Sequence, residues 1–244
     1  MEAGLRNHMP ALLVLGSKPD PIVPARGAFD ALGCANASGR TGRTLGLVDP
    51  IFTVLSSVVA SGKNASNRLA LTALRGLYTE RLFVYPRPPY PHSLAKRLRH
   101  FRQVLRTKPL PLRLVLRRAG YRYGQIEFAS LASFTERVRT LCGGAPEVDA
   151  AMRAKAPSTG VMAIAIGLAD RRWDRVIASG FSFEVTHGYA ANPDIEERGS
   201  AASVHADTDI TILRHLAKCD DRLATTEPIV HERTGLALLA GRAS

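Results

Sequence analysis

Short, continuous apolar runs that end at glycine or asparagine predict buried strands opening into loops. Residues 11–15 form the first such run, and Gly16 ends it. Residues 32–35 form the second, which Asn36 follows, and a glycine-rich basic loop is expected over residues 39–46. Runs of this length without alternation are typical of strands buried on both faces of a parallel sheet. The carboxyl ends of such strands bind ligands in open α/β sheets, so both run ends are candidate binding positions.

Leucines at spacings of three and four predict helices in the first half of the chain. They occur over residues 68–77, and residues 81–85 then predict a strand that stops at a proline-rich stretch. Residues 94–105 carry apolar side chains at the same spacings, with lysines and arginines mostly on other faces. This amphipathic pattern is typical either of a helix lying on a membrane or of a surface helix packed on its own domain.

The clearest helix of the second half follows Pro157. Ser158 is placed to cap it, and an apolar stretch continues to a predicted end near Arg171. A strand over residues 175–178 and a helix over residues 209–216 come next. The alternation of helices and strands predicts an α/β domain with a mostly parallel central sheet.

The whole chain, residues 1–244, is predicted to form a single domain. A chain of 244 residues that is 45% hydrophobic can bury one substantial core. No apolar run approaches the roughly 20 residues that cross a bilayer, so we expect a soluble, cytoplasmic protein. Three cysteines without a Cys-x-x-Cys spacing suggest neither a disulfide framework nor a zinc site. Residues 184–204 are polar and aperiodic, and we expect them to form a lid.

Basic side chains are concentrated in one segment. The chain has a formal net charge of +12, and residues 81–126 contain 12 lysines or arginines but no aspartate or glutamate. The acidic and basic side chains outside this segment cancel. Such a segment favours a nucleic acid, an anionic membrane surface or an acidic substrate as partner, unless it is only a solvated helix face. We assign residues 86–125 as a basic surface that faces the acceptor or a membrane.

The start of the helix after Pro157 also has a chemical interpretation. Ser158, Thr159 and Gly160 place small side chains and unpaired backbone N–H groups where a helix carries partial positive charge. Such a helix start can bind a phosphate, and it can equally be a cap without a ligand.

Residues 157–161 and 176–181 together resemble a motif shared by sialyltransferases, both the animal enzymes and the bacterial family 42 enzymes. The Pro-Ser-Thr-Gly form of the first part is closer to the animal motif. Residues 179–183 and 205–210 look more like the bacterial enzymes, and His205 matches their catalytic base. The resemblance implies a Rossmann-like, GT-A-type variant of the α/β fold, with a mostly parallel central sheet and a lid segment.

The resemblance extends to the predicted N-terminal strands. Residues 14–17 and 34–36 are similar to the elements that hold cytidine monophosphate (CMP) in the family. The chain departs from the family at Ser17, where members usually carry asparagine. Asn64 is the candidate for the family's second donor-binding asparagine. The donor-binding positions that the resemblance implies are Gly16, Ser17, Asn36, Asn64, Ser158, Thr159, Gly160, Ser179, Gly180 and Phe181.

The resemblance implies transfer of sialic acid, or a related nonulosonate, from a CMP-sugar donor to a glycan acceptor with inversion. His205 would be the general base, since imidazoles titrate near neutrality and can take the proton of an acceptor hydroxyl. Tyr189, in the lid, matches tyrosines that contact the phosphate. Hydroxyl and helix N–H groups can stabilise departing CMP, so neither a metal nor a cofactor is expected. Bacterial relatives extend lipid-linked surface glycans such as lipopolysaccharide or capsule at the inner membrane, and family members often form oligomers.

Four other interpretations stay open. The donor sugar can be Kdo, since nothing in the chain separates the two donors. Asp207 and Asp209 form the Asp-x-Asp pattern with which other glycosyltransferases hold a divalent metal and a nucleotide diphosphate. Residues 81–126 can instead bind nucleic acid, with arginines on phosphates and aromatic rings on bases. Ser17 suggests a family member that binds the donor without turnover.

Overall fold

The computed structural model of the chain describes residues 9–62, 65–86, 98, 101–184 and 202–242. The strands are β1 (Ala11–Leu15), β2 (Ala31–Ala35), β3 (Phe52–Ser56), β4 (Tyr78–Tyr85), β5 (Arg122–Phe128), β6 (Arg175–Ser179), β7 (Leu223–Thr225) and β8 (Ala237–Leu238). The helices are α1 (Gly39–Thr44), the 3-10 helix η1 (Ser57–Ser61), α2 (Ala65–Ala73), α4 (Phe101–Arg106), α5 (Pro109–Arg118), α6 (Leu131–Leu141), α7 (Pro146–Ala154), α8 (Thr159–Ala169), α10 (Ala206–Cys219) and α11 (Pro228–Thr234).

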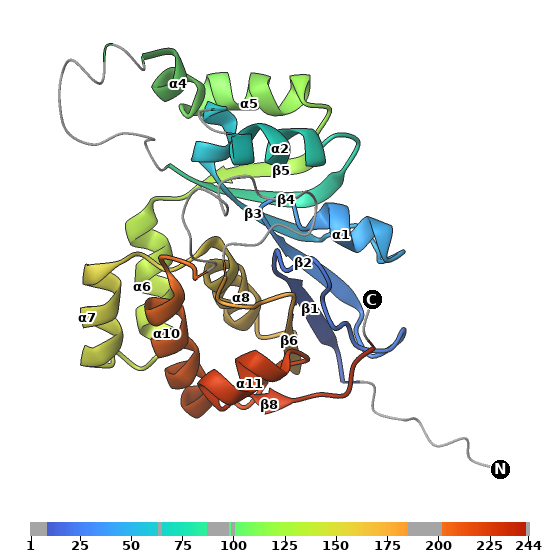
Figure 1. Ribbon diagram of the computed structural model, residues 1–244, viewed down its shortest axis with the longest axis vertical. Coiled ribbons are helices and arrows are strands. Elements are labelled where there is room, and N and C mark those ends of the chain that lie inside the picture. Colours follow the sequence, from blue (N-terminus) through green and yellow to red (C-terminus); the bar gives the residue numbers. More distant parts are fainter. Residues whose placement is uncertain (1–8, 63–64, 87–97, 99–100, 185–201, 243–244) are drawn as a thin grey trace.

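Within the described residues, eight strands form one sheet in the order β5-β4-β3-β2-β1-β6-β7-β8. Every neighbouring pair is parallel, which confirms the predicted α/β fold with a parallel central sheet. The chain runs outward from β1 to β5 and then returns to the other side of β1 as β6 (Figure 1). The direction of progression thus reverses between β1 and β6. Open α/β sheets bind ligands at such a reversal, beside the carboxyl ends of the strands.

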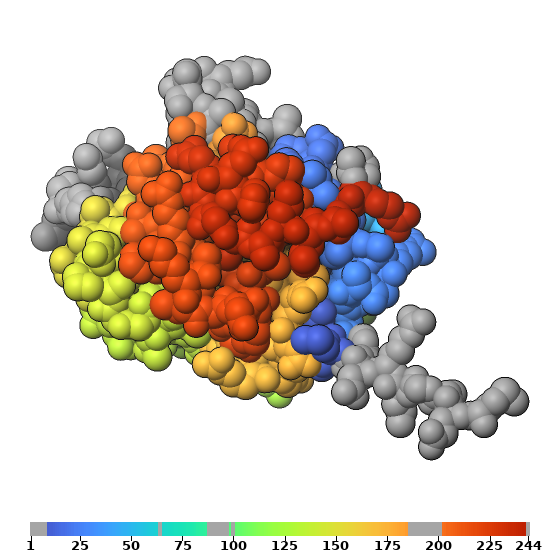
Figure 2. All heavy atoms as spheres, turned by 90° about the horizontal axis from the view of Figure 1, so that it is seen from below, coloured from blue at the N-terminus to red at the C-terminus, as the bar shows by residue number. Residues whose placement is uncertain are grey.

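Helices cover both faces of this sheet, and the alternation along β4 shows how the layers are divided. Phe83 and Tyr85 pack with α6, α8 and α10, whereas Leu82 and Val84 pack with α2 and α5. Successive side chains of a strand point to opposite faces, so β4 contributes to both cores. Figure 2 views the molecule from below, where the orange and red residues of the C-terminal part, α10 and α11 among them, form the middle of the surface.

Helix α8 is the central helix of the larger core. Its side chains from Val161 to Leu168 are all buried, and Ser158 caps it as predicted by accepting a hydrogen bond from Val161 N at 3.3 Å. A helix that is apolar all round is typical of the protein interior. Gly167 lets α8 approach β1 closely, since a Cβ at this position would lie 2.7 Å from Leu12 Cδ2.

Some predicted elements need correction. The glycine-rich loop predicted over residues 39–46 is wrong, because α1 occupies most of it. Gly42 serves packing, because a Cβ at this position would lie 3.3 Å from Leu32 Cδ2. The strand predicted over residues 81–85 begins earlier, at Tyr78. The amphipathic helix predicted over residues 94–105 lies largely outside the described residues. No described helix is long and apolar enough to cross a bilayer.

Candidate functional site

The loops after β1 and β6 meet in a close backbone contact at the switch point. Gly16 N donates to Ser179 O at 2.8 Å, and Lys18 N donates to Gly180 O at 2.9 Å. A Cβ at Gly16 would lie 2.3 Å from Gly180 O, so this approach requires glycine. Ser17 lies between these two hydrogen-bonded residues and is half-buried at the edge of the sheet. The structure therefore brings Gly16, Ser17 and Gly180 together at one edge, and their role in donor binding stays a prediction.

The N-terminus of α8 lies beside the same edge. A Cβ at Gly160 would lie 2.5 Å from Phe181 Cε1, and a Cβ at Gly16 would lie 3.2 Å from Phe181 Cδ2. The Phe181 ring thus packs between the two glycines and joins the β1 and β6 ends to α8. On the other side, the Thr159 hydroxyl and the Tyr85 hydroxyl are hydrogen-bonded at 2.7 Å, which brings in the end of β4.

His205 stands at the N-cap of α10 and turns toward the segment that precedes α8. Its Nδ1 is 2.7 Å from Ala156 O. A carbonyl oxygen only accepts, so Nδ1 must carry the proton. In the neutral ring the lone pair then belongs to Nε2, which is the form that a general base requires.

Asp209 holds the same segment from one turn further along α10. It is buried, and its Oδ1 accepts a hydrogen bond from Ser158 N at 2.9 Å. Burial raises the pKa of Asp209 to about 7, while hydrogen bonds from the Ser158 side chain and backbone act in the opposite direction. The first turn of α10 therefore fixes Ala156 through His205 and Ser158 through Asp209, and so places the imidazole beside the start of α8.

Asn36 and Ser56 mark the carboxyl ends of β2 and β3. Asn36 has a φ of 52°, a left-handed conformation that asparagine tolerates better than most residues. Its Oδ1 accepts a hydrogen bond from Ser56 N at 3.4 Å. The Ser56 hydroxyl is buried and has no hydrogen-bond partner among the described residues. An unsatisfied buried hydroxyl at this edge makes Ser56 a candidate binding residue, which sequence reasoning missed.

Glu227 is a second residue that sequence reasoning missed. Its side chain is fully buried, forms an ion pair with Lys18, and accepts hydrogen bonds from Ile22 N and Gly180 N, both at 2.9 Å. It thereby holds the β1 and β6 loops together from the start of α11. No local pattern indicates this role, because Lys18 and Glu227 are 209 positions apart.

Other predicted residues contribute differently or lie outside the described part of the chain. Ser179 is buried, and its hydroxyl donates to Ile22 O at 2.9 Å, so its side chain serves the loop rather than the surface. Asn64 and Tyr189, with most of the predicted lid, lie outside the described residues. In Asp-x-Asp, Asp207 is exposed and Asp209 is buried, because positions two apart on a helix do not face each other.

The predicted absence of a metal stays a prediction. Among the residues that the structure describes, no three histidine, cysteine, aspartate or glutamate side chains are grouped as metal ligands.

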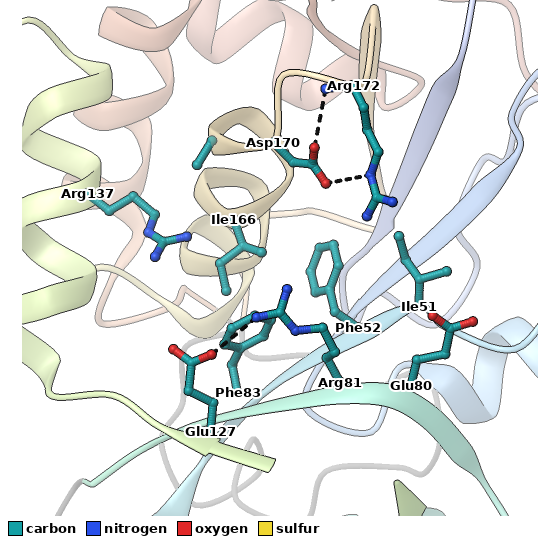
Figure 3. Close-up of a pocket in the computed structure, with 11 residues that line it drawn as sticks. Ile51, Phe52, Glu80, Arg81, Phe83, Glu127, Arg137, Ile166, Asp170 and Arg172 are labelled. Carbon is teal, nitrogen blue, oxygen red and sulfur yellow. Dashed lines mark hydrogen bonds and ion pairs between the residues drawn. The ribbon is translucent and has the colours of Figure 1, made fainter. Parts of the chain in front are cut away.

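A cavity of about 240 Å³ lies at the other end of α8 (Figure 3). It is lined by Ile166 and Asp170, which lie about 10–17 Å along the helix axis from Thr159 at a rise of about 1.5 Å per residue. Its charges are largely satisfied locally: Asp170 pairs with Arg172 at 2.7 Å, and Arg81 pairs with Glu127 at 3.3 Å. This cavity is separate from the switch point, where the predicted residues gather.

The fold of this chain is similar to the GT-A-like fold of solved sialyltransferases. A CMP-bound variant of the sialyltransferase CstII aligns with 97% of this chain and 88% of its own, at a TM-score of 0.55 and 10% identity. CstII from Campylobacter jejuni with CMP-3FNeuAc aligns with 96% of this chain and 87% of its own, at 0.52 and 12%. The α-2,3-sialyltransferase Cst-I from Campylobacter jejuni aligns with 100% of this chain and 88% of its own, at 0.51 and 13%. No protein-family model and no curated protein sequence matches the chain.

Proposed function

We propose that this protein is an inverting glycosyltransferase that moves sialic acid, or a related nonulosonate, from a CMP-sugar to a glycan acceptor. The observation that carries the proposal is the contact of His205 with Ala156. It places the imidazole beside the N-terminus of α8, and a helix start of this kind can bind a phosphate. The shared fold with sialyltransferases bound to CMP and CMP-3FNeuAc supports the same reaction class.

In the proposed reaction, the acceptor hydroxyl loses its proton to His205 Nε2. The acceptor oxygen forms a bond to the anomeric carbon from one side, while the bond from that carbon to the CMP phosphate oxygen breaks on the other. CMP leaves with the electron pair, and the configuration at the anomeric carbon inverts. Thr159 and Gly160 lie in the first helical turn, where backbone N–H groups have no partner within the helix and favour the leaving phosphate.

The donor-binding surface in this proposal follows the carboxyl ends of the strands. Asn36 presents amide N–H donors that make no hydrogen bond with a described residue, and the Ser56 hydroxyl lies beside it. Gly16 and Gly180 allow the backbone to approach the nucleotide closely. Asn64 would add a contact to the donor, and Tyr189 would contact its phosphate from the lid.

The reaction is proposed to need no metal. Departing CMP is stabilised by fixed N–H and hydroxyl donors, so no divalent cation has to bridge two phosphates. The rival Asp-x-Asp interpretation is weakened by the geometry of α10, where Asp209 is committed to Ser158 N.

A donor panel tests this proposal. CMP-sialic acid, CMP-Kdo and a UDP-sugar are each incubated with the protein in EDTA, and release of the nucleotide is measured with and without a panel of simple glycan acceptors. Release from a CMP-sugar in EDTA is expected, and the preferred donor decides between sialic acid and Kdo. Turnover of only the UDP-sugar, restored by a divalent metal, would contradict the proposal. Tight CMP binding with no turnover of any donor would identify a binding protein instead.

The acceptor is proposed to be a glycan or glycolipid of the cell surface, such as a precursor of lipopolysaccharide or capsule, with the enzyme acting in the cytoplasm at the inner membrane. A homo-oligomer is compatible with this role. Size-exclusion chromatography with light scattering gives the oligomeric state independently of turnover.

A further inference from the structure

Helices α4 and α5 present large apolar side chains to solvent. Phe101 and Leu105 on α4 are 60% and 44% exposed, and Leu110 and Leu114 on α5 are 78% and 48% exposed. Each pair is four residues apart and so lies on one side of its helix. The opposite side of α5 packs in the core, where Leu112 and Leu116 are fully buried. The exposed leucines are therefore additional to the apolar face that folding requires.

The same two helices are strongly basic. The six lysines and arginines of residues 101–118 are all exposed, and the segment contains no carboxylate. None of the six forms an ion pair with a described residue. They are Arg102, Arg106, Lys108, Arg113, Arg117 and Arg118. Unneutralised positive charge around exposed leucines is typical of helices that lie in the interface of an anionic bilayer.

This surface lies at the edge of the sheet that carries the candidate site. η1 begins directly after the carboxyl end of β3, and both α4 and α5 pack against it. Figure 1 shows α4 and α5 at one end of the long axis of the molecule, outside α2. A membrane contacted there would face the edge where Asn36 and Ser56 lie.

We infer that the face formed by α4 and α5 docks on an anionic lipid bilayer, with Phe101, Leu105, Leu110 and Leu114 inserted among the acyl chains and the basic side chains on the headgroups. Lipid binding by this face is independent of the proposed transfer reaction, because it needs neither donor nor base. If both hold, the bilayer brings a glycolipid acceptor to the site.

The chemistry of the face favours lipid over nucleic acid. Single-stranded nucleic acids are held by arginines together with aromatic rings on which bases stack. Three of the four inserted side chains are leucines, which offer no stacking surface but gain free energy in acyl chains. Phe101 is the one aromatic side chain among the exposed apolar residues of α4 and α5 in the described part of the chain.

Flotation of the full-length protein with vesicles tests the inference. One set of vesicles contains phosphatidylcholine alone, and the other contains a third phosphatidylglycerol. The apolar variant Phe101→Ser/Leu110→Ser is matched by Val48→Ser/Ile229→Ser, which removes exposed apolar side chains elsewhere. The charge variant Arg102→Gln/Arg117→Gln/Arg118→Gln is matched by Arg153→Gln/Arg171→Gln/Arg175→Gln, which changes the net charge equally. Circular dichroism and thermal melting confirm that all four remain folded.

Binding to the anionic vesicles is expected, with little binding to phosphatidylcholine. The charge variant should lose about fivefold in affinity per arginine, the equivalent of about 1 kcal/mol each. The apolar variant should lose about tenfold, and its loss should persist at high salt, because insertion is not screened. Both matched controls should bind like the wild type. Equal losses in variants and controls would overturn the inference, as would binding to single-stranded nucleic acid with no vesicle binding. Dimerisation that the apolar variant abolishes, without vesicle binding, would assign the face to a second copy instead.

Discussion

At the scale of single residues, His205 and Asp209 depend on the same short segment before α8. The imidazole bonds Ala156 and the carboxyl group bonds Ser158, so one helical turn carries both the proposed base and the group that fixes its position. Asp209 is buried, and for that reason its protonation state affects stability as well as geometry.

The Asp209→Asn variant is predicted to change how stability depends on pH. Burial raises the pKa of Asp209 from 3.8 to about 7 in the folded protein. The folded state therefore binds the proton more tightly than the unfolded state does. The resulting contribution of Asp209 to the free energy of unfolding is complete below pH 4 and is lost as the pH rises to 7. Asparagine resembles the protonated acid and should remove this loss. Relative to the wild type, the variant should gain about 2–4 kcal/mol between pH 4 and pH 8.

Urea unfolding at pH 4.5, 6 and 8 measures this difference. The comparison uses the change in the free energy of unfolding between variant and wild type, because other groups titrate equally in both. Parallel pH profiles would contradict the assignment of a raised pKa to Asp209.

Gly160→Ala is predicted to destabilise the protein despite the better helix propensity of alanine. The new Cβ would lie 2.5 Å from Phe181 Cε1, so the ring has to move away from residue 160. Overpacking of this kind costs about 1–3 kcal/mol. Gly39→Ala is the control, since its Cβ would meet Leu77 Cδ1 at an ordinary 3.5 Å. Thermal unfolding compares the two, and equal midpoints would show that Phe181 yields without cost.

At the scale of elements, α11 fixes the loops at the switch point through Glu227. Glu227→Gln keeps an acceptor for the N–H groups of Ile22 and Gly180 but leaves Lys18 without its carboxylate. The Lys18 side chain is only 26% exposed, so a loss of about 2–3 kcal/mol is expected. Chemical unfolding measures it, with the exposed Glu232→Gln on the same helix as control. A loss no larger than in the control would contradict this role.

The pattern of apolar residues predicted several of the buried elements, but it missed β3 and β7, which are buried along their whole length. β1, β2 and α8 are continuous apolar segments, and they were predicted within about two residues. β5 was not predicted, because it forms the edge of the sheet and its residues from Arg122 to Phe128 are exposed or half-buried rather than apolar. In α1 the glycines suggested a loop, whereas at Gly42 the lack of a side chain serves close packing of the helix on β2.

The candidate site was predictable where a residue ends a strand or starts a helix. Gly16, Asn36 and Ser158 satisfy that rule. Ser56 also ends a strand, but it was missed because β3 was not predicted. Glu227 and the Asp209 contact with Ser158 were not predictable, because they join segments that meet only when the chain folds. The proposed role of His205 as a base came from resemblance, and its Nδ1 contact with Ala156 supports that proposal.

At the scale of the whole molecule, the two ends of α8 lie beside regions of different chemistry. The carboxyl edge gathers glycines, hydroxyls, an amide and an imidazole, whereas the cavity at the C-terminal end of α8 holds paired charges. The fold is shared with CMP-bound sialyltransferases at only 10–12% identity. At this identity the likeness shows the fold alone, so the chemistry has to be tested at the edge itself.

Donor turnover by His205→Ala beside His231→Ala tests the central proposal most directly. Both histidines use Nδ1 to bond a carbonyl at 2.7 Å, Ala156 O for His205 and Leu236 O for His231, but only His205 lies at the start of α10 beside α8. CMP release from CMP-sialic acid and CMP-Kdo is measured in EDTA with an acceptor. We predict that His205→Ala loses about 100-fold or more, the scale of a missing general base, while His231→Ala keeps wild-type turnover. Equal turnover in the two variants would show that His205 is not the base.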